Sequence, residues 1–271
     1  MRLQTLKSLS QQEFELLIRR LGVAYGREDS FKLTRPHVLA DRTLLGMRTT
    51  GLSCADVLAT CRSLDMPAQY EEIIETNYGD ANVVLFGLEP RGGSCTVKVY
   101  LEFWDVVRRR VRETGSRTPL LLNLGVKWEP GHPLQHGLAR YTCFPLLSVG
   151  DAIGRIGVLL ANSSREMVSA GLGLIRQAAQ RVPGAAFVYL ECEEAGNPRR
   201  SYDINLYQSG LRLADGQAFI DRACAHLGCP PATVWERSGP RADRRLGHLS
   251  GGIGRDGREF MTVYYEIEPL P

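Results

Sequence analysis

The pattern of hydrophobic and polar positions changes character near residue 22. Before that point apolar residues recur at helical spacing, so the sequence predicts an amphipathic helix over Gln11 to Leu21. Beyond it, short segments alternate between apolar and polar residues, which is typical of strands with one buried face. In 94–103, apolar side chains occupy every second position, from Cys95 to Phe103. The chain is therefore predicted to combine helices with half-buried strands.

The alternating segments come in pairs. The five pairs are 31–36 with 43–50, 82–89 with 94–103, 119–128 with 138–145, 186–193 with 201–208, and 244–250 with 259–267. Turns such as 90–93 and 196–198 contain the glycine and proline residues that permit a reversal of direction. The pairs are predicted to be antiparallel hairpins.

Helical patterns separate the hairpins. They cover Ser53 to Leu64, Trp104 to Thr114, Val149 to Ala161, Ser164 to Arg181, and Gly216 to Leu227. The second strands of the hairpins begin 44 to 63 residues apart, near 43, 94, 138, 201 and 259. A unit of hairpin plus helix therefore recurs five times as a structural repeat without detectable sequence identity.

The apolar strand faces need a cover, and the intervening helices are the elements available to supply it. Ten strands can close on themselves, which removes the exposed edges and leaves a cavity wider than side chains alone can fill. We therefore expect an α+β fold: a ten-stranded antiparallel β-barrel built from five hairpin-plus-helix repeats, with the helices outside. The expected organisation is a single domain over residues 1–271.

Composition narrows the class of protein. The chain has 44% hydrophobic and 23% charged residues, which argues against disordered and collagen-like proteins. No apolar run approaches the roughly 18 residues of a membrane span, and the first residues lack an apolar signal segment, so we expect a cytoplasmic protein. A formal net charge of +3 does not by itself indicate nucleic acid. Seven cysteines without a CxxC pair predict buried free thiols.

The polar strand faces carry basic, phenolic and acidic residues that a closed barrel would bring into one interior. They are Arg48, Lys98, Tyr100, Glu102, Lys127, Arg140, Tyr189, Glu191, Asn205, Tyr207, Tyr264 and Glu266. Cations that share a cavity repel one another, so such a set indicates a polyanionic ligand such as a diphosphate. Tyrosine rings add cation–π attraction of about 0.5–2 kcal/mol each. The set suits ionisation of an allylic diphosphate; the alternative is the solvated side of a two-layer sheet.

These strands resemble those of the ABBA prenyltransferases, which are built from α-β-β-α units around a ten-stranded barrel. "TVKVYLEFW", with Lys98 and Tyr100, is similar to the family's Lys-x-Tyr strand, and "SYDINLYQSG", with Asn205 and Tyr207, to its Asn-x-Tyr strand. Arg48 in "LLGMRTT" is placed like the arginine of the first hairpin, Lys127 and Arg140 fall in the third, and Tyr264 in "MTVYYEIE" is like the tyrosine of the last.

The chain departs from the family in two ways. It is shorter than most members, and the third hairpin has Arg140-Tyr141-Thr142 where fungal indole enzymes have a longer Arg-x-Lys-x-Tyr run. The departures fit a bacterial branch, including the peptide-modifying one, and equally a barrel whose chemistry has been lost or changed.

The resemblance implies transfer of a dimethylallyl or geranyl group from its diphosphate to an aromatic small molecule or a peptide side chain. Arg48, Lys98, Lys127 and Arg140 are then expected to bind the diphosphate, and Tyr100, Tyr207 and Tyr264 to donate hydrogen bonds to it and shield the allylic cation. Tyr189 and Asn205 complete the expected substrate-binding set. Glu102, Glu191 and, as third choice, Glu266 are the expected proton acceptors.

Other motifs limit the chemistry. No DDxxD cluster is present, so the sequence requires no cofactor, although Mg²⁺ stays compatible with it, and no metal ligands are predicted. P-loop, HExxH and GxSxG motifs are also absent from the sequence. The stretch 250–257 is interpreted as a hairpin turn and not as a phosphate cradle, and Arg108-Arg109-Arg110 as a solvated helix face and not as an RNA contact. Two alternative functions remain: a non-catalytic barrel that binds a small anion or a lipid-like ligand, and a nucleic-acid-binding sheet.

Overall fold

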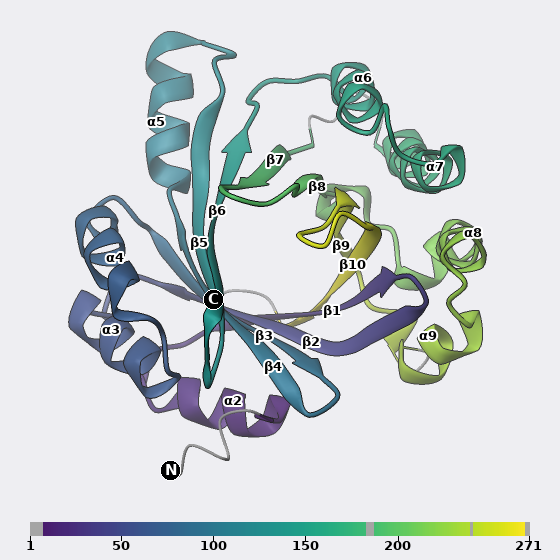
Figure 1. Cartoon of the computed structure of the whole chain (residues 1–271). Helices are drawn as coiled ribbons and strands as arrows, with labels where there is room; N and C mark the ends of the chain where they lie inside the picture. The colour runs from purple at the N-terminus through teal and green to yellow at the C-terminus, as the bar shows by residue number, and fades with distance from the viewer. Residues whose placement is uncertain (1–7, 183–186, 239–240, 269–271) are drawn as a thin grey trace.

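Ten antiparallel strands form a closed barrel in the computed structural model, which describes residues 8–182, 187–238 and 241–268 (Figure 1). The strands are β1 Gly26–Thr34, β2 His37–Arg48, β3 Val83–Arg91, β4 Ser94–Glu102, β5 Leu120–Glu129, β6 His132–Cys143, β7 Tyr189–Glu194, β8 Arg200–Asn205, β9 Leu246–Ile253 and β10 Glu259–Glu268. Each strand pairs with its neighbours in the sequence, and β1 also pairs with β10. The predicted ten-stranded antiparallel barrel is therefore confirmed.

Helices surround the barrel on the outside (Figure 1). They are α2 Gln11–Arg19, α3 Cys54–Ser63, η1 Ala68–Tyr70, α4 Glu71–Tyr78, α5 Trp104–Thr114, α6 Val149–Leu159, α7 Arg165–Arg181, η2 Tyr207–Ser209, η3 Leu213–Gly216, α8 Gln217–Leu227 and α9 Pro231–Ser238. The six helices predicted from periodicity all form. Helices α4 and α9 were not predicted, because each is a single short element of eight residues with few apolar positions to mark a period.

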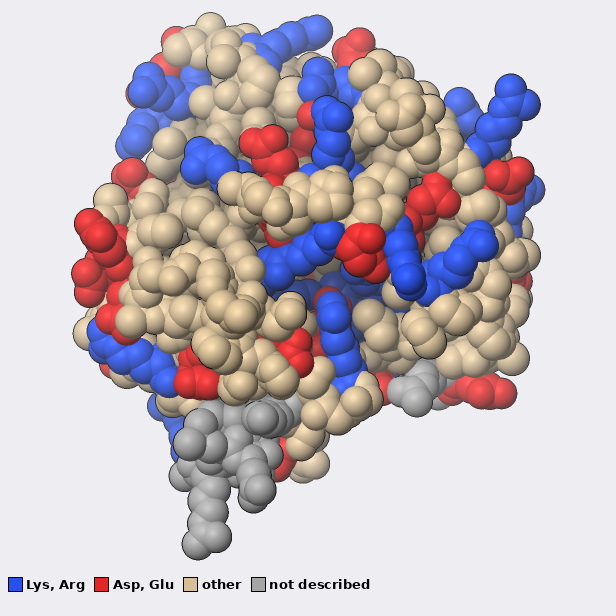
Figure 2. Space-filling view, viewed as in Figure 1, with Lys and Arg blue, Asp and Glu red and all other residues tan. Residues whose placement is uncertain are grey.

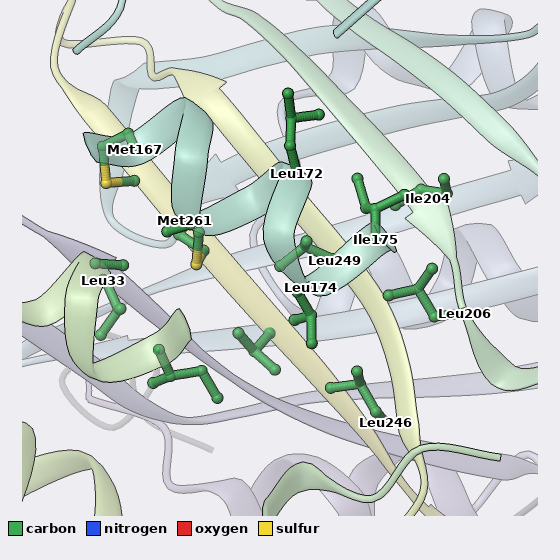
Figure 3. Close-up of a cluster of buried hydrophobic side chains, with 14 of the residues drawn as sticks. Leu33, Met167, Leu172, Leu174, Ile175, Ile204, Leu206, Leu246, Leu249 and Met261 are labelled. Atoms are coloured by element: carbon green, nitrogen blue, oxygen red, sulfur yellow. The ribbon is translucent and has the colours of Figure 1, made fainter. Parts of the chain in front are cut away.

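The larger hydrophobic core lies between the C-terminal half of the barrel and helices α6 to α8. Figure 3 shows Leu174 of α7 near Leu249 of β9, and Met167 of α7 near Met261 of β10. All four side chains are buried. The apolar faces of β8 to β10 thus pack outward against helices, as alternation requires when the other face lines the barrel interior.

A second core lies between strands β2 to β5 and helices α2 to α4. Phe14 of α2, Phe86 of β3 and Trp128 of β5 are fully buried there. The indole Nε1 of Trp128 donates to the carbonyl oxygen of Leu64 at 2.6 Å, so the one polar atom of this large side chain is satisfied. The two cores hold the helices on opposite sides of the barrel.

The barrel has two distinct ends. The tight turns of all five hairpins lie at one end, and the longer helical connections lie at the other. Along β4, Lys98 pairs with Lys127 near the hairpin end, whereas Glu102 pairs with Asn123 near the helical end. Four residues of a strand span about 13 Å, so each strand carries its interior side chains from one end of the lumen to the other.

Candidate active site

The barrel encloses a cavity of about 300 Å³. It is lined by Glu28, Ser30, Arg42, Thr43, Leu44, Leu85, Gly87, Leu88, Lys98, Tyr100, Glu102, Trp104, Leu122, Asn123, Tyr141, Val188, Leu190, Asp203, Asn205, His248 and Tyr264. All ten strands contribute, because the inward-facing residues of a barrel alternate with the outward-facing ones along each strand. The cavity is large enough for a small ligand and mixes charged, phenolic and apolar walls.

Basic side chains gather around the carboxylate of Glu89 near the hairpin turns. Lys98 Nζ lies 2.7 Å and Arg42 Nε 3.1 Å from Oε2 of Glu89, and Arg91 Nη2 lies 2.9 Å from Oε1. Burial acts to raise the pKa of Glu89, but Lys98 and Arg42 hold it well below its ordinary value. Glu89 is therefore ionised and surrounded by more positive charge than it can neutralise.

A second buried carboxylate, Glu194, lies in a similar environment beside Tyr141. Lys127 Nζ contacts Glu194 Oε1 at 2.7 Å and Arg199 Nη1 contacts the same oxygen at 2.6 Å, while Arg255 Nε donates to Oε2. The side chain of Glu194 is fully buried. Burial acts to raise its pKa, but Lys127 and Arg199 hold it far below its ordinary value. Arg199 Nη2 also donates to the hydroxyl of Tyr141 at 3.3 Å.

We call this region the cation end of the barrel. It consists of Lys32, Arg42, Lys98, Lys127, Arg199 and Arg255 together with Glu89 and Glu194. Six basic side chains face two carboxylates, and the arginines Arg42, Arg199 and Arg255 alone outnumber those carboxylates, so positive charge is in excess. Figure 2 shows Lys and Arg side chains gathered around a hollow at the centre of one face of the molecule. Two buried donors, Arg199 Nε and Arg255 Nη2, have no hydrogen-bond partner among the described residues.

Burial lowers the pKa values of all three lysines at the cation end, and it lowers that of Lys98 well below its ordinary value although Glu89 opposes the shift. Burial lowers the pKa of Lys127 to about 8, with the neighbouring Arg199 adding to the effect. Burial also lowers the pKa of Lys32 to about 8, although the carboxylate of Glu89 opposes the shift. Bringing an anion close to these groups would favour their charged forms.

Tyrosines line the middle of the cavity. The rings of Tyr100 and Tyr141 meet edge to face, with centroids 5.8 Å apart, and Tyr264 lies 5.8 Å from the guanidinium carbon of Arg42. Gly125 permits this arrangement, because a Cβ at that position would lie 2.5 Å from the ring of Tyr100. Burial raises the pKa of each of these phenols, so they remain protonated hydrogen-bond donors.

Acidic side chains gather near the helical connections, and we call this region the acid end. It consists of Glu28, Glu102 and Asp203 with His248 and Asn205. His248 Nδ1 lies 2.8 Å from Asp203 Oδ1, and its Nε2 lies 3.8 Å from Glu28 Oε1. Burial opposes protonation of His248, but Asp203 and Glu28 outweigh it and raise its pKa to about 9.

Glu102 is the acidic residue of this end whose pKa is raised. Burial is the main cause, and His248 opposes it. The hydroxyl of Tyr207 donates a hydrogen bond to Oε1 of Glu28. Burial thus increases the tendency of Glu102 to take up a proton.

The structure brings together many of the predicted site residues. The cavity is lined by Lys98, Tyr100, Glu102, Asn205 and Tyr264. Lys127 donates a hydrogen bond to Glu194, and its Nζ lies 5.8 Å from the centre of the Tyr141 ring. Tyr207 belongs to the short helix η2, because β8 ends at Asn205, and it contacts the acid end and not the cation end. The individual roles of these residues stay predictions.

Three predicted interior residues point outward, so the sequence interpretation was wrong about their orientation. Arg140 is exposed, because the next residue, Tyr141, occupies the inward position on β6. Tyr189 donates to Glu191 at 2.9 Å, and Glu191 forms a salt bridge of 2.8 Å with Arg155 of α6, outside the barrel. Apolar residues on both faces of these strands concealed the register, and a shift by one residue reverses the side on which every side chain lies.

Arg48 does not join the cavity, and for Glu266 the structure leaves the prediction untested. Arg48 is the last residue of β2 and is exposed, and it does not contribute to the cavity wall. Glu266 belongs to β10, but its side chain lies outside the part that the structure describes.

Sequence reasoning also missed residues of the cation end, among them Arg42, Glu89, Glu194, Arg199 and Arg255. Arg42 was excluded because the predicted strand began at 43, whereas β2 begins at His37. A signal for Arg42 is nevertheless present in the sequence. Arg42 lies an even number of positions from Leu44 and Arg48, which places all three residues on the same face of a strand. Arg255 lies in the predicted turn between β9 and β10, and nothing in a turn indicates where a long side chain will reach.

The described residues contain no group of three or more histidine, cysteine, aspartate or glutamate side chains arranged to hold a metal ion. In the same part of the chain, every helix is too short or too polar to cross a membrane.

Comparison with solved structures identifies the fold. The chain resembles the prenyltransferase PriB in complex with diphosphate, with 16% identity and a TM-score of 0.60 over 90% of this chain and 82% of that one. It resembles 5-dimethylallyltryptophan synthase from Streptomyces coelicolor, with 18% identity and a TM-score of 0.54 over 98% and 84% of the two chains.

A third similar structure is 6-dimethylallyltryptophan synthase from Micromonospora olivasterospora in complex with DMASPP and Trp. It is 14% identical, with a TM-score of 0.53 over 89% of this chain and 81% of that one. No family model and no curated protein matches the sequence. Identities this low establish the architecture alone, and at that level the resemblance predicted from the strand motifs is confirmed: the chain has the barrel fold of the ABBA prenyltransferases.

Proposed function

We propose that the protein transfers an allylic prenyl group from its diphosphate to an electron-rich acceptor inside the barrel. The observation that carries this proposal is the excess of buried positive charge at the cation end, where Arg42 and Lys98 line the cavity. At the same end, Arg199 Nε and Arg255 Nη2 have no partner among the described residues, although neither arginine lines the cavity.

The cation end would bind the diphosphate and stabilise it as a leaving group. Arg42 and Lys98 line the cavity, so their charges reach a ligand directly. When the allylic carbon–oxygen bond breaks, the electron pair leaves with the diphosphate, and fixed positive charge favours that change. The tyrosine hydroxyl of Tyr264, close to Arg42, is placed to donate a further hydrogen bond.

The allylic cation would form among the tyrosine rings. Tyr100 and Tyr141 present aromatic surfaces in the middle of the cavity, and each ring face attracts a nearby cation by about 0.5–2 kcal/mol. The enclosing barrel also limits the access of water, which would otherwise quench the cation. This arrangement supports an ionisation mechanism with a protected intermediate.

The acid end would hold the acceptor. An electron-rich carbon or nitrogen of the acceptor attacks the cation, a new bond to the prenyl group forms, and the proton lost by the acceptor goes to a carboxylate. Glu102 is assigned this role, because it lines the cavity and burial raises its pKa. Glu28 and Asp203 would hold and orient hydrogen-bond donors of the acceptor.

A direct assay tests the proposal. The protein is incubated with dimethylallyl diphosphate or geranyl diphosphate and a panel of acceptors that includes tryptophan, and released diphosphate and prenylated products are measured by mass spectrometry. We expect prenylated product and released diphosphate in equal amounts. Binding of the diphosphates without release of diphosphate in the presence of any acceptor would refute the proposal.

A second candidate is a barrel that binds a small anion without turnover. The observation that favours it is that Glu89 and Glu194 already engage the cations at 2.6 to 3.1 Å. In such a protein, a bound diphosphate would compete with the carboxylates of Glu89 and Glu194 for the same cations. No prenylated product would form. The same assay separates the two candidates, because calorimetry reports binding while mass spectrometry reports transfer.

A further inference from the structure

A second hollow lies outside the barrel, between α5 and the segment that links β6 to α6. We call it the groove, and its volume is about 380 Å³. Its floor is apolar and is formed by Val107, Val111, Cys143, Phe144, Leu146 and Phe187. Leu146 is 49% exposed, which is unusual for so large an apolar side chain. In Figure 1, α5 and α6 flank this part of the barrel wall.

The groove adjoins the acid end of the cavity. Trp104 and Val188 line both spaces. A small cluster of hydrophobic side chains separates the groove from the cavity. In it, Val107 and Cys143 of the groove pack against Leu122 and Leu190 of the cavity. An elongated ligand in the groove would reach the proposed acceptor position by passing Trp104 and Val188, the two residues that line both spaces.

Two arginines edge the groove, and the charge of one of them, Arg108, is near enough to Glu102 to act on its pKa. Arg108 and Arg112 lie one helical turn apart on α5, and both are exposed. Neither side chain forms a salt bridge or a hydrogen bond with any residue that the structure describes, although the Arg108 guanidinium lies 5.1 Å from the centre of the Trp104 ring. The neighbouring Arg109 and Arg110 are also exposed but do not line the groove. Positive charge thus borders an apolar floor on one side.

We propose that the groove docks a peptide acceptor that carries apolar side chains next to acidic ones. The apolar residues would pack on Val111 and Phe144, the acidic residues would pair with Arg108 and Arg112, and an aromatic side chain of the same peptide would enter the acid end beside Trp104. This inference rests on the proposed function, since it names the acceptor class. A peptide fits better than a nucleic acid, because the floor is apolar and nucleic-acid sites need a longer array of cations.

Charge reversal with a matched control tests the proposal. The probe is the fluorescein-labelled peptide Trp-Gly-Leu-Glu-Leu-Glu, compared with its counterpart in which lysine replaces both glutamates. Binding is measured by fluorescence polarisation with the whole protein, the double variant Arg108→Glu/Arg112→Glu, and the control Arg109→Glu/Arg110→Glu. The two variants change the net charge equally and on the same helix, so their comparison isolates the groove from long-range electrostatics.

The acidic peptide is expected to bind the unaltered protein, to lose affinity at least about tenfold with Arg108→Glu/Arg112→Glu, and to keep it with the control. The lysine peptide should bind the groove variant better than the unaltered protein, which a merely structural effect would not produce. Equal binding of both peptides, or equal losses in both variants, would overturn the inference. So would tighter binding of a labelled dodecauridylate, or a dimer that dissociates in the groove variant in sedimentation.

The outcome is independent of turnover. Peptide binding without release of diphosphate would leave the groove assigned and remove the proposed transfer. Transfer to free tryptophan without peptide binding would leave the proposed function in place and remove the groove as a docking site.

Discussion

The guanidinium group of Arg255, from the β9–β10 turn, packs against Gly137 of β6 at the cation end. A Cβ at position 137 would lie 2.6 Å from Nη2 of Arg255, which is one of the buried donors without a partner among the described residues. The absence of a side chain on β6 is therefore what admits a guanidinium group from a turn that lies far away in the sequence. The positive charge of the site depends on this complementarity.

Replacement of Gly137 with alanine is predicted to displace the Arg255 guanidinium and weaken diphosphate binding about tenfold, because a charge-assisted hydrogen bond is lost. Calorimetric titration with inorganic diphosphate measures the effect. Gly92→Ala is the matched control, since a Cβ there meets nothing within 4 Å. Unchanged affinity in Gly137→Ala would show that Arg255 does not contact the ligand.

Lys98→Met is predicted to lower kcat/KM for transfer by about 100-fold, because it removes a cation that lines the cavity beside the leaving group. Folding should survive, since Arg42 and Arg91 still pair with Glu89. Arg140→Met makes a similar change on the exposed outer face of β6 and should leave the rate unaltered. A comparable loss in both variants, or unfolding of Lys98→Met in a thermal melt, would contradict the assignment.

Glu102→Gln is predicted to slow product formation about 100-fold while leaving diphosphate affinity unchanged, because only proton removal is affected. Since burial raises the pKa of Glu102, the transfer rate should rise with pH through a value above the ordinary 4.5 of a glutamate. The pH dependence of kcat measures this. Glu191→Gln, outside the barrel, serves as the control. Persistence of the pH profile in Glu102→Gln would assign the base elsewhere.

Diphosphate affinity is predicted to fall as pH rises above about 8. Lys32 and Lys127 have pKa values of about 8 in the free protein, so they carry charge below that pH and lose it above. Binding an anion raises both pKa values and takes up protons. Calorimetry at pH 8 in buffers of different ionisation enthalpy should therefore detect proton uptake, and Lys127→Gln should reduce it. Proton release on binding would show that the sign is wrong.

His248 is predicted to stabilise the fold in a pH-dependent manner. Its pKa is about 9 in the folded protein and about 6.5 when unfolded, so its stabilisation is complete below pH 6.5 and disappears as pH rises through 9. The shift corresponds to on the order of 3 kcal/mol. Urea unfolding of the unaltered protein and of His248→Gln should differ most near pH 6 and converge above pH 9. If the difference in the free energy of unfolding does not change with pH, protonation of His248 does not contribute to stability.

The sequence alone determined the architecture and part of the site. Alternation over 94–103 assigned Lys98, Tyr100 and Glu102 to the interior because their strand has a purely apolar opposite face that must meet helices. Where both faces mix apolar and polar residues, as on β6 and β7, the pattern left the register undetermined. Arg140 and Glu191 were accordingly placed on the wrong face, since charge is tolerated outside wherever water or a partner such as Arg155 is available.

The tertiary structure alone decided how charge is distributed along the barrel axis. Glu89, Glu194, Arg199 and Arg255 lie near turns or strand ends, where no periodicity indicates direction, and their long side chains meet only when the strands close. The groove has the same origin, because it exists where α5 and the β6–α6 connection leave the wall uncovered. Local patterns record which face a residue prefers, whereas the separation of a cation end from an acid end arises from how distant hairpins align in space.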